Sequence, residues 1–560
     1  MQAFYHPFIR PQYWRLLRFA PLMGWLFTVA CTPGYRDGDS KKIFRYNESS
    51  NITSLDPAFA RSQANIWGVN QLFNGLVQLT DNLEVAPCIA KDFMVSADGL
   101  SYTFLLRNDV YFHDSECFVN GKGRKVTVGD FIFSFFRITD PTLISPGAWV
   151  FRNVRCLNGK PDFIAVNDTM LTITLQKPFP AFMGLLSMQY CSVVPHEAVE
   201  YYGPEFRRNP VGTGPFKLKM WIEGMKMVMV KNENYFEKLD GQPLPLLDAV
   251  AITFIVDKQT AFLEFIKGNL DFMSGIDASY KDELITRSGQ LNPRYTDRVK
   301  MITQPYLNTE YLAFQINPAK SASPDNPLLI KEIRQAINMG FDRVKMMRYL
   351  RNNIGTPGIY GFVPPGLPSF DSTGDFGYHY DPDKARQLIA LAGYPEGRGL
   401  PEITIATNAS YLDLTRYFQH QLNEIGIRIK IEVSPPATLR EMIAQGKVPF
   451  FRASWIADYP DTENYLSLFY SPNFTPAGPN YTHFTSVIFD KLYQESLIQT
   501  NDSLRYRLYR EMDSLIMESA PVVVLYYDQV LRFVQNGISG IGSNAMNLLH
   551  LKKVDKSQDH

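Results

Sequence analysis

This chain has little cysteine and histidine, the residues on which many metal and redox sites depend. Its 560 residues include five cysteines and eight histidines, and the cysteines show no zinc-ligand spacing. A G-x-S-x-G segment, an H-E-x-x-H motif and a Walker A loop are also missing from the sequence. These absences argue against the common metal-, serine- and nucleotide-dependent enzymes, and we expect neither a metal nor a cofactor.

An excess of charge of either sign is missing as well. Lysine and arginine total 56, aspartate and glutamate total 56, and the formal net charge is zero. Because nucleic-acid binding requires a basic face, we expect no nucleic-acid partner. Aromatic residues make up 13% of the chain, which indicates large cores or a stacking site. The length suffices for several domain-sized units around one site.

Long apolar runs are absent except near the N-terminus. Arg10, Arg15 and Arg18 precede "FAPLMGWLFTVAC", an apolar stretch that ends in small residues before Cys31. The stretch is shorter than the ~20 residues that span a bilayer. Its order of basic, apolar and small residues is typical of a secretory signal. We therefore interpret residues 1–30 as a signal peptide.

The cysteine that follows the expected cleavage point suggests a membrane anchor. A cysteine in this place resembles the signal of bacterial lipoproteins, which implies a lipid on Cys31 and an exported, membrane-anchored protein on the periplasmic or cell-surface side. Simple secretion is the alternative, since Thr28 stands where leucine is usual in the lipoprotein pattern. The polar residues 31–43 then form a tether.

Four more cysteines follow this region, namely Cys88, Cys117, Cys156 and Cys191. Export permits disulfide bonds. A Cys117–Cys156 bond is one arrangement that the sequence allows, and buried free thiols are the other.

The part of the chain from about 44 to 277 is rich in strand patterns. Apolar and polar residues alternate in "DGLSYTFLLRNDVYFHD" (98–114), which predicts an antiparallel hairpin with its turn at Asn108 and a second short strand "VYF". A strand is predicted at 171–180. A further hairpin is predicted at 211–236, where glycines allow the bends.

The second half alternates strands and helices. Asn326 and Pro327 open a helix, and Asp381 and Pro382 open another. Between about 402 and 455 the pattern runs strand, helix, strand, helix, strand, which is typical of a parallel sheet with right-handed crossovers. Strand character returns at 521–534. A chain that begins and ends with strands around an α/β unit suggests two lobes.

The segment "PFFRASWIADYPDTENY" (449–465) places an acidic residue just beyond one of these strands. Ligands of open α/β sheets lie beyond the carboxyl ends of the strands. Trp455 ends the predicted strand, Asp458 follows it, and Pro460 restricts Tyr459 to an extended conformation. Asp458 is therefore a candidate ligand residue; the alternative is that it caps a helix or stabilises a turn.

Ten segments of the chain together resemble one known family. They are "SLDPAFA", "QLFNGLV", "APCIAKDFMVSADGLSYTFLLRNDVYFHDSE", "KVTVGDFIFSFFRITDP", "NPVGTGPFKLKMW", "FLEFIKGNLDFM", "LIKEIRQAINMGFDR", "YDPDKARQLIALAGYP", "WIADYPDTENYLSLFY" and "APVVVLYYDQVLRFV". In this order, over about residues 44–555, they resemble the extracellular solute-binding proteins of family 5, the oligopeptide- and dipeptide-binding proteins of bacterial ABC importers.

The resemblance implies an α/β fold of the periplasmic-binding-protein type with two lobes that close over a ligand. Lobe I would comprise residues 44–277 plus 523–560, with an extra subdomain at about 86–190. Lobe II would comprise residues 278–522. The implied function is capture of a peptide in the cleft, without catalysis, and delivery to the permease subunits of an ABC transporter.

The resemblance also implies roles for single residues. In peptide-binding members, the aspartate of the W-x-A-D-Y segment pairs with the α-ammonium of the ligand, which corresponds to Asp458. Trp455 would line a side-chain pocket, with Tyr459 beside it. Arg452 would receive a ligand carboxylate, or form a structural ion pair at the strand end. Trp149 falls where the extra subdomain often contributes an aromatic residue to the cleft, with core packing as the alternative.

Other cargoes remain open at this point. Relatives with the same scaffold bind oligosaccharides or metal complexes, and a fold does not determine the ligand. Tyr459 and Tyr465 would suit a sugar, whereas no convergent metal ligands are evident. A secreted hydrolase is a remote alternative, because Asp458, Asp461 and Glu463 lie too close in sequence to flank a sugar ring.

Overall fold

The computed structural model describes residues 41–320, 325–374 and 376–557. Residues 1–30 and Cys31, with the predicted signal peptide and lipid attachment, lie outside the described residues. Within the described ranges no helix is both long and apolar enough to cross a membrane.

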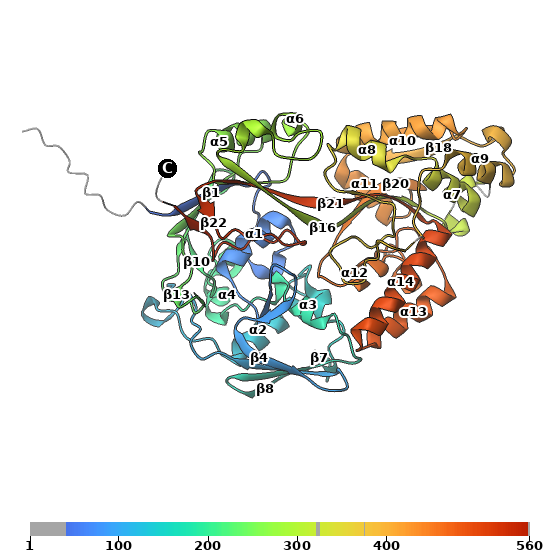
Figure 1. Cartoon of the computed structure of the whole chain (residues 1–560). Coiled ribbons are helices and arrows are strands. Elements are labelled where there is room, and N and C mark those ends of the chain that lie inside the picture. Colours follow the sequence, from blue (N-terminus) through green and yellow to red (C-terminus); the bar gives the residue numbers. More distant parts are fainter. Residues whose placement is uncertain (1–40, 321–324, 375, 558–560) are drawn as a thin grey trace, which may run out of the picture. The chain divides into compact units, whose positions relative to one another are not determined.

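An eleven-stranded mixed sheet runs through the molecule (Figure 1). Ten of its strands form one continuous path, and β17 (Thr356–Pro357) pairs with β21 beside that path. In spatial order the ten are β10 (Phe216–Ile222), β11 (Lys226–Lys231), β14 (Ala249–Thr253), β1 (Ile43–Asn47), β15 (Phe272–Ser274), β21 (Val522–Gln535), β16 (Val299–Phe314), β20 (Phe450–Ile456), β18 (Ile403–Thr407) and β19 (Ile429–Val433).

Two long antiparallel strands, β16 and β21, join the two halves of this sheet. The first residues of β16 pair with the last residues of β21, which also pair with β15. The last residues of β16 pair with the first residues of β21 on one edge and with β20 on the other. We call the half-sheet from β10 to β15, with the elements packed on it, the first lobe, and the half-sheet β20-β18-β19, with its helices, the second lobe.

The expected α/β fold with two lobes is confirmed. Because β16 and β21 extend from one lobe into the other, the division between the lobes falls inside these two strands. The exact boundaries at 277/278 and 522/523 stay predictions.

A separate four-stranded antiparallel sheet belongs to the region predicted as an extra subdomain. Its order is β4 (Ala90–Val95), β5 (Ser101–Leu106), β9 (Met170–Thr174) and β8 (Phe163–Asn167). Helix α2 (Val128–Thr139) packs on it through Phe131 and Phe135. The helix begins with a capping box, in which Asp130 accepts hydrogen bonds from Thr127.

One predicted hairpin in this region is wrong. Residues 110–112 form no strand beside β5; Tyr111 makes only an isolated bridge with Lys125. Both edges of β5 are already paired, with β4 and with β9. The predicted hairpin at 211–236 is confirmed as β10 and β11.

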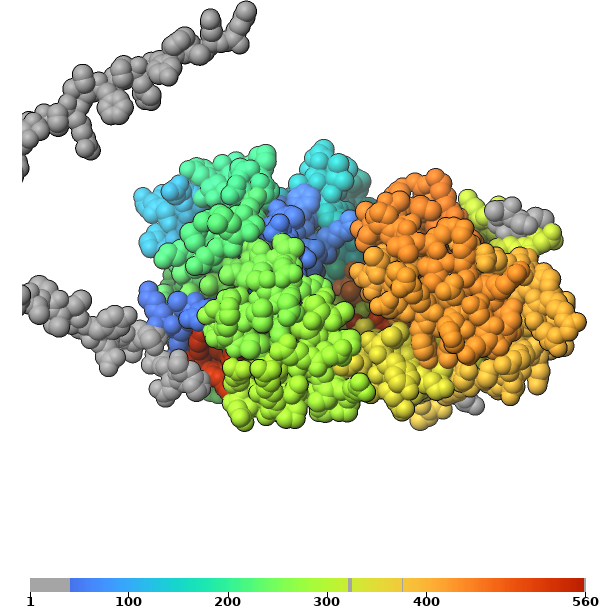
Figure 2. Space-filling view, turned by 90° about the horizontal axis from the view of Figure 1, so that it is seen from above, coloured from blue at the N-terminus to red at the C-terminus, as the bar shows by residue number. Residues whose placement is uncertain are grey.

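The second lobe contains the predicted strand–helix alternation. Strand β18 pairs in parallel with β19 and with β20, and helices α10 (Leu412–Glu424) and α11 (Pro436–Ala444) connect these strands. The other helices of this lobe are α7 (Lys331–Met339), α8 (Arg343–Leu350), α9 (Pro382–Leu391), α12 (Glu463–Leu466), α13 (Val487–Ile498) and α14 (Asp502–Ser519). In Figure 2 this lobe, yellow to orange, lies beside the blue and green first lobe.

The first lobe holds shorter helices that matter for the site. They are α1 (Gln63–Leu72), α3 (Phe182–Leu186), α4 (His196–Tyr202), α5 (Lys258–Ile266) and α6 (Lys281–Leu284), and the 3₁₀-helices η1 (Pro57–Phe59), η3 (Ala148–Phe151) and η4 (Gln189–Cys191).

The four cysteines of the described chain are free thiols, so the Cys117–Cys156 bond is not formed. Burial raises the pKa of Cys88 to about 12, so this thiol stays protonated and inert.

Candidate ligand-binding site between the lobes

The segment that follows β20 carries Asp458, and Asn464 orients it. The side-chain oxygen of Asn464 accepts hydrogen bonds from Trp455 Nε1, at 2.9 Å, and from the backbone nitrogen of Asp458, at 3.2 Å. Its amide nitrogen donates to Asp458 Oδ2 at 3.5 Å. One buried side chain at the start of α12 therefore positions both the tryptophan and the aspartate that the sequence singled out.

The Asp458 carboxylate is accessible to water and yet has protein around it. Its side chain is exposed, but nearby protein partly desolvates it and raises its pKa, while Asn464 and the charge of Arg61 oppose that rise. Exposure to water and partial desolvation are both expected for a carboxylate that lies on the wall of a cleft. A ligand can therefore reach this carboxylate.

Residues of the first lobe border the same segment. A Cβ atom added to Gly184 in α3 would lie 3.7 Å from atoms of Tyr459 and of Pro460. Burial raises the pKa of Tyr190 in η4 to about 12, and the negative charge of Asp458 adds to the rise. Asp458 therefore lies where the second lobe meets α3 and η4 of the first.

Tyr459 and Trp149 contact each other across the lobes. Their ring centroids are 6.1 Å apart and the rings are tilted by 39°. The hydroxyl of buried Tyr459 donates to Glu463, whereas Trp149 is half-buried at η3. Tyr459 thus forms part of the contact between the lobes, and Trp149 is the more accessible of the two rings.

Arg452 is engaged inside the second lobe. Its guanidinium forms an ion pair with Glu310 of β16, with side-chain exposures of 10% and 4%. Its Cζ atom also lies 3.3 Å from the centroid of the Tyr411 ring. Burial raises the pKa of Glu310, and the positive charge of Arg452 opposes the rise. The structural ion pair considered from the sequence is therefore present.

This ion pair belongs to a row of polar groups across the strands that join the lobes. Asn308 Nδ2 donates to Glu310 Oε1 at 3.1 Å and lies 3.4 Å from Asp528 Oδ2. Asp528 of β21 accepts a hydrogen bond from Arg351 at 2.7 Å. Each carboxylate of the row has its own arginine, Glu310 with Arg452 and Asp528 with Arg351, which compensates for their burial.

A cavity of about 450 Å³ lies beside these strands. Both lobes line it, the first with Gln63, Trp67 and Lys258 and the second with Arg351 and Tyr411; Tyr306 and Asp528 come from the joining strands. None of the five predicted ligand residues lines this cavity. Burial raises the pKa of Tyr465, and the nearby Tyr306 and Asp458 add to the rise, which relates this cavity to the predicted site.

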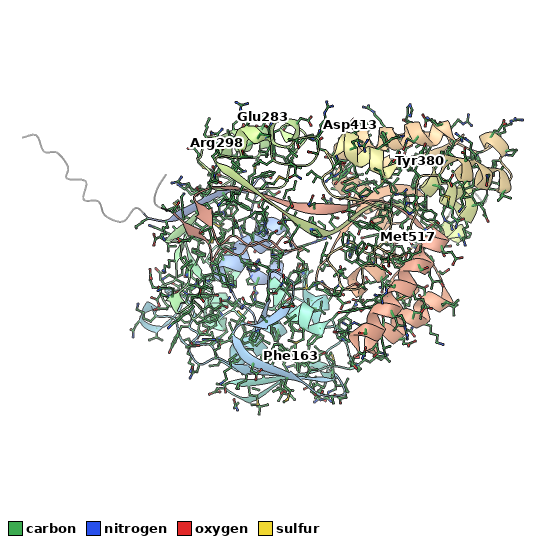
Figure 3. The ribbon with its side chains drawn as sticks, viewed as in Figure 1. Phe163, Glu283, Arg298, Tyr380, Asp413 and Met517 are labelled. Atoms are coloured by element: carbon green, nitrogen blue, oxygen red, sulfur yellow. The ribbon has the colours of Figure 1, made fainter. Side chains whose placement is uncertain are left out.

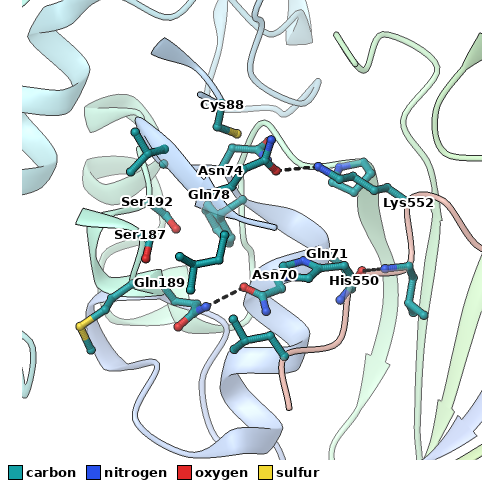
Figure 4. A pocket seen from close by; sticks show the side chains of 18 of the residues that line it. Asn70, Gln71, Asn74, Gln78, Cys88, Ser187, Gln189, Ser192, His550 and Lys552 are labelled. Carbon is teal, nitrogen blue, oxygen red and sulfur yellow. Dashed lines mark hydrogen bonds between the residues drawn. The ribbon is translucent and has the colours of Figure 1, made fainter. Parts of the chain in front are cut away.

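Two of the other cavities in the first lobe bear on the choice of site. The one in Figure 4 has about 50 Å³ and is lined by polar groups such as Asn70, whose Oδ1 accepts from Gln189 at 2.9 Å. It is too small for a peptide. The other has about 650 Å³ and is lined by Arg107, Glu237 and Lys552, with no residue of the second lobe.

The remaining acids of the segment point inward. Glu463 is buried and accepts hydrogen bonds from Tyr459 and Tyr493. Asp461 accepts from Tyr509 at 2.8 Å and lies 3.7 Å from Arg505. These two carboxylates are held by internal partners, so only Asp458 of the three is accessible. Within the described ranges, no group of three histidine, cysteine or carboxylate side chains could hold a metal ion.

Sequence reasoning missed Asn464, Glu310 and Arg61. Asn464 stands in the polar run "DTEN" at the start of a helix, a signal that a search for caps could have used. Glu310 sits in a long strand of otherwise ordinary pattern, and no local signal marks it. Arg61 follows "SLDPAFA", one of the segments that carry the resemblance.

Comparison with known proteins gives one consistent result. Residues 84–476 match the model described as bacterial extracellular solute-binding proteins, family 5 middle. The glutathione-binding protein GsiB of Salmonella typhi is 25% identical over 498 residues, which cover 88% of this chain and 90% of that protein.

Solved structures resemble this chain in fold. DppA from Helicobacter pylori in complex with the peptide STSA is 24% identical, with a TM-score of 0.75 over 92% of this chain and 99% of that one. NikZ from Campylobacter jejuni in complex with Ni(L-His) is 22% identical, with a TM-score of 0.72 over 92% and 100%. One scaffold thus carries cargoes of different chemistry.

Proposed function

This chain belongs to the bacterial extracellular solute-binding proteins of family 5, and from that premise we propose that it binds short peptides between its lobes. The ligand's α-ammonium pairs with Asp458, its first side chain lies near Trp455 and Trp149, and closure of the lobes encloses it. The protein then delivers the peptide to the permease of an ABC importer. Catalysis is no part of this function.

One observation carries the proposal: Asp458 is an accessible carboxylate, held by Asn464, at the place where the two lobes meet. A buried ammonium without a partner is strongly unfavourable, and a single fixed carboxylate meets that need. Peptide backbones can pair with a strand edge regardless of sequence. The peptide complexes among the related proteins support the same cargo.

The two strands that join the lobes supply the hinge in this proposal. Hinge closure concentrates its backbone changes in a few residues at such crossings. The register between β16 and β21 shifts between Pro305 and Thr309, which is the irregularity that we assign to the hinge. The body of the ligand extends toward the cavity of about 450 Å³ beside these strands.

Location outside the cytoplasm is the second part of the proposal. Cleavage after residue 30, followed by a lipid on Cys31, would tether residues 31–43 to a membrane and hold the binding lobes beside the permease. Mass spectrometry of the protein from membranes tests this part. An unmodified cysteine or an uncleaved N-terminus would contradict it.

Titration calorimetry of residues 32–560 against a ligand panel tests the cargo. The panel contains peptides with free and with acetylated N-termini, oligosaccharides and metal–histidine complexes. We expect binding of peptides with free N-termini. Binding of a sugar or a metal complex instead of every peptide would assign the scaffold to one of the alternative cargoes.

A further inference from the structure

Arg61 is an exposed cation of the first lobe that no group of the described chain neutralises directly. It lies between η1 and α1, and its backbone nitrogen donates to Phe59 O at 2.8 Å. Among the described residues, its guanidinium has neither a hydrogen-bond partner nor an ion pair. The backbone on either side is fixed, because Asp56 caps η1 and Ser62 caps α1.

The turn between η1 and α1, which carries Arg61, is rigid and borders the segment of Asp458. The carboxylate of Asp56 is bonded to Arg137, and Ala58 O accepts from Ser145 Oγ at 2.7 Å. The chain continues from Ser145 to Gly147, where a Cβ atom would lie only 2.4 Å from Cγ of Tyr190. The next turn carries Trp149, which contacts Tyr459.

Arg61 and Asp458 are electrostatic neighbours on opposite lobes. Burial raises the pKa of Asp458, of Tyr190 and of Tyr481, and the positive charge of Arg61 opposes the rise in each case. Arg61 and Asp458 nevertheless form no ion pair with each other. Two unlike charges of different lobes thus lie near each other without forming an ion pair.

We propose that Arg61 receives a carboxylate at the N-terminal residue of the ligand, beside the ammonium that Asp458 holds. The preferred ligands are then peptides whose first residue is acidic, either an α-linked N-terminal aspartate or glutamate or a γ-linked glutamyl residue. This inference rests on the proposed function. An ordinary solvated arginine would instead leave peptide selectivity unchanged.

The physical reason is that such a ligand joins both lobes through charge-assisted hydrogen bonds. A guanidinium fits a carboxylate bidentately, and such bonds are stronger than neutral ones. A ligand shifts a conformational equilibrium only by its difference in affinity for the two states. An acidic first residue makes that difference larger, because its ammonium and its carboxylate contact Asp458 and Arg61 at the same time only in the closed form.

Three tripeptides test the inference: Glu-Ala-Ala, γ-Glu-Ala-Ala and Gln-Ala-Ala. We expect wild-type protein to bind at least one of the two acidic peptides at least about 10-fold more tightly than Gln-Ala-Ala. Comparison of Glu-Ala-Ala with γ-Glu-Ala-Ala shows whether the protein prefers the α-linked or the γ-linked glutamate. Arg61→Gln should abolish this preference while it leaves the affinity for Gln-Ala-Ala nearly unchanged. Arg61→Lys should restore part of the preference.

Arg416→Gln is the matched control. Arg416 is an exposed arginine of α10, on the outer helix layer next to Asp413, which Figure 3 labels, and we expect its replacement to keep the wild-type preference. Equal affinities of the three peptides for wild-type protein, or a preference that survives Arg61→Gln, would overturn the role of Arg61 and leave the proposed function standing. Failure of all three to bind would overturn both.

Discussion

The ring of Trp149 lies 6.1 Å from the ring of Tyr459, centroid to centroid, and the two residues belong to different lobes. Tyr459 directly follows Asp458, so this contact lies beside the candidate anchor of the ligand. Tyr459 is held by a hydrogen bond to Glu463, whereas Trp149 is the more exposed of the two rings. We propose that the contact stabilises the closed form of the lobes next to the site.

Trp149→Ala should weaken peptide binding by about 0.5–1.5 kcal/mol, the usual contribution of an aromatic pair beyond its buried area. The closed form loses this contact, whereas the core of each lobe is unchanged. Calorimetry measures the affinity and small-angle scattering the closure. Trp149→Phe keeps an aromatic ring and should behave nearly as wild type. Unchanged affinity in Trp149→Ala would contradict a role in closure.

Asp458→Asn should weaken the binding of peptides with free N-termini by about 2–5 kcal/mol, because the ligand's ammonium then lacks its negative partner. N-acetylated peptides should bind both proteins equally weakly. Asp413→Asn, at an exposed acid of α10, is the control and should change nothing. If the acetylated and free peptides bind wild-type protein alike, Asp458 is not the anchor.

Peptide affinity should fall at acidic pH in a way that depends on Asp458. Partial desolvation raises the pKa of this carboxylate above its ordinary value, and the protonated acid cannot pair with an ammonium. The loss of affinity on lowering the pH therefore begins at a higher pH than for an ordinary aspartate. Calorimetry from about pH 7 to about pH 4 measures this loss of affinity. If Asp458→Asn shows the same pH dependence as wild-type protein, Asp458 is not the group that causes it.

Arg452→Met should lower the free energy of unfolding by about 3–5 kcal/mol, because it leaves Glu310 buried without its cation. Adding Glu310→Gln should recover much of that loss. Urea unfolding followed by circular dichroism measures both variants. If Arg452→Met lowers peptide affinity strongly while stability is unchanged, the guanidinium serves the ligand, as the resemblance suggested, and not the fold.

Asp513 gives stability a dependence on pH. Burial raises the pKa of its carboxylate to about 6, against the hydrogen bonds from the backbone of Phe362 and Val363. The folded state holds this proton more tightly than the unfolded chain, so stability falls as the pH rises from about 4 to about 6. The shift corresponds to about 3 kcal/mol.

Asp513→Asn removes this titration. Chemical unfolding at several pH values should show a flatter dependence for the variant than for wild type over that range. Parallel curves for the two proteins would mean that Asp513 titrates normally.

Local sequence patterns predicted much of the fold. The alternation of apolar and polar residues predicted β5, and a proline after a polar capping residue predicted the start of α9. Partner choice is different, because a strand can pair with any edge that tertiary packing brings to it. The 98–114 hairpin failed for this reason: β5 takes β4 and β9, which come from elsewhere in the chain.

The candidate site could likewise be predicted only in part from the sequence. Asp458 could be named from the sequence, since it follows a strand of a parallel sheet and matches a family segment. Arg452 could be named too, but not its use, because Glu310 lies 142 positions away. Asn464 is near in sequence, yet its bonds to Trp455 and Asp458 depend on the exact direction of the turn.

By itself, the sequence determined the two-lobe α/β class, the family and the acidic residue after β20, because these follow from periodicity, capping and segment order along the chain. Only the tertiary structure decided which charges are paired and which remain open to a ligand. Charge pairing depends on distances of a few ångströms between residues far apart in the chain. Within the described ranges, that packing left Arg61 and Asp458, unlike Arg452, without an ion-pair partner.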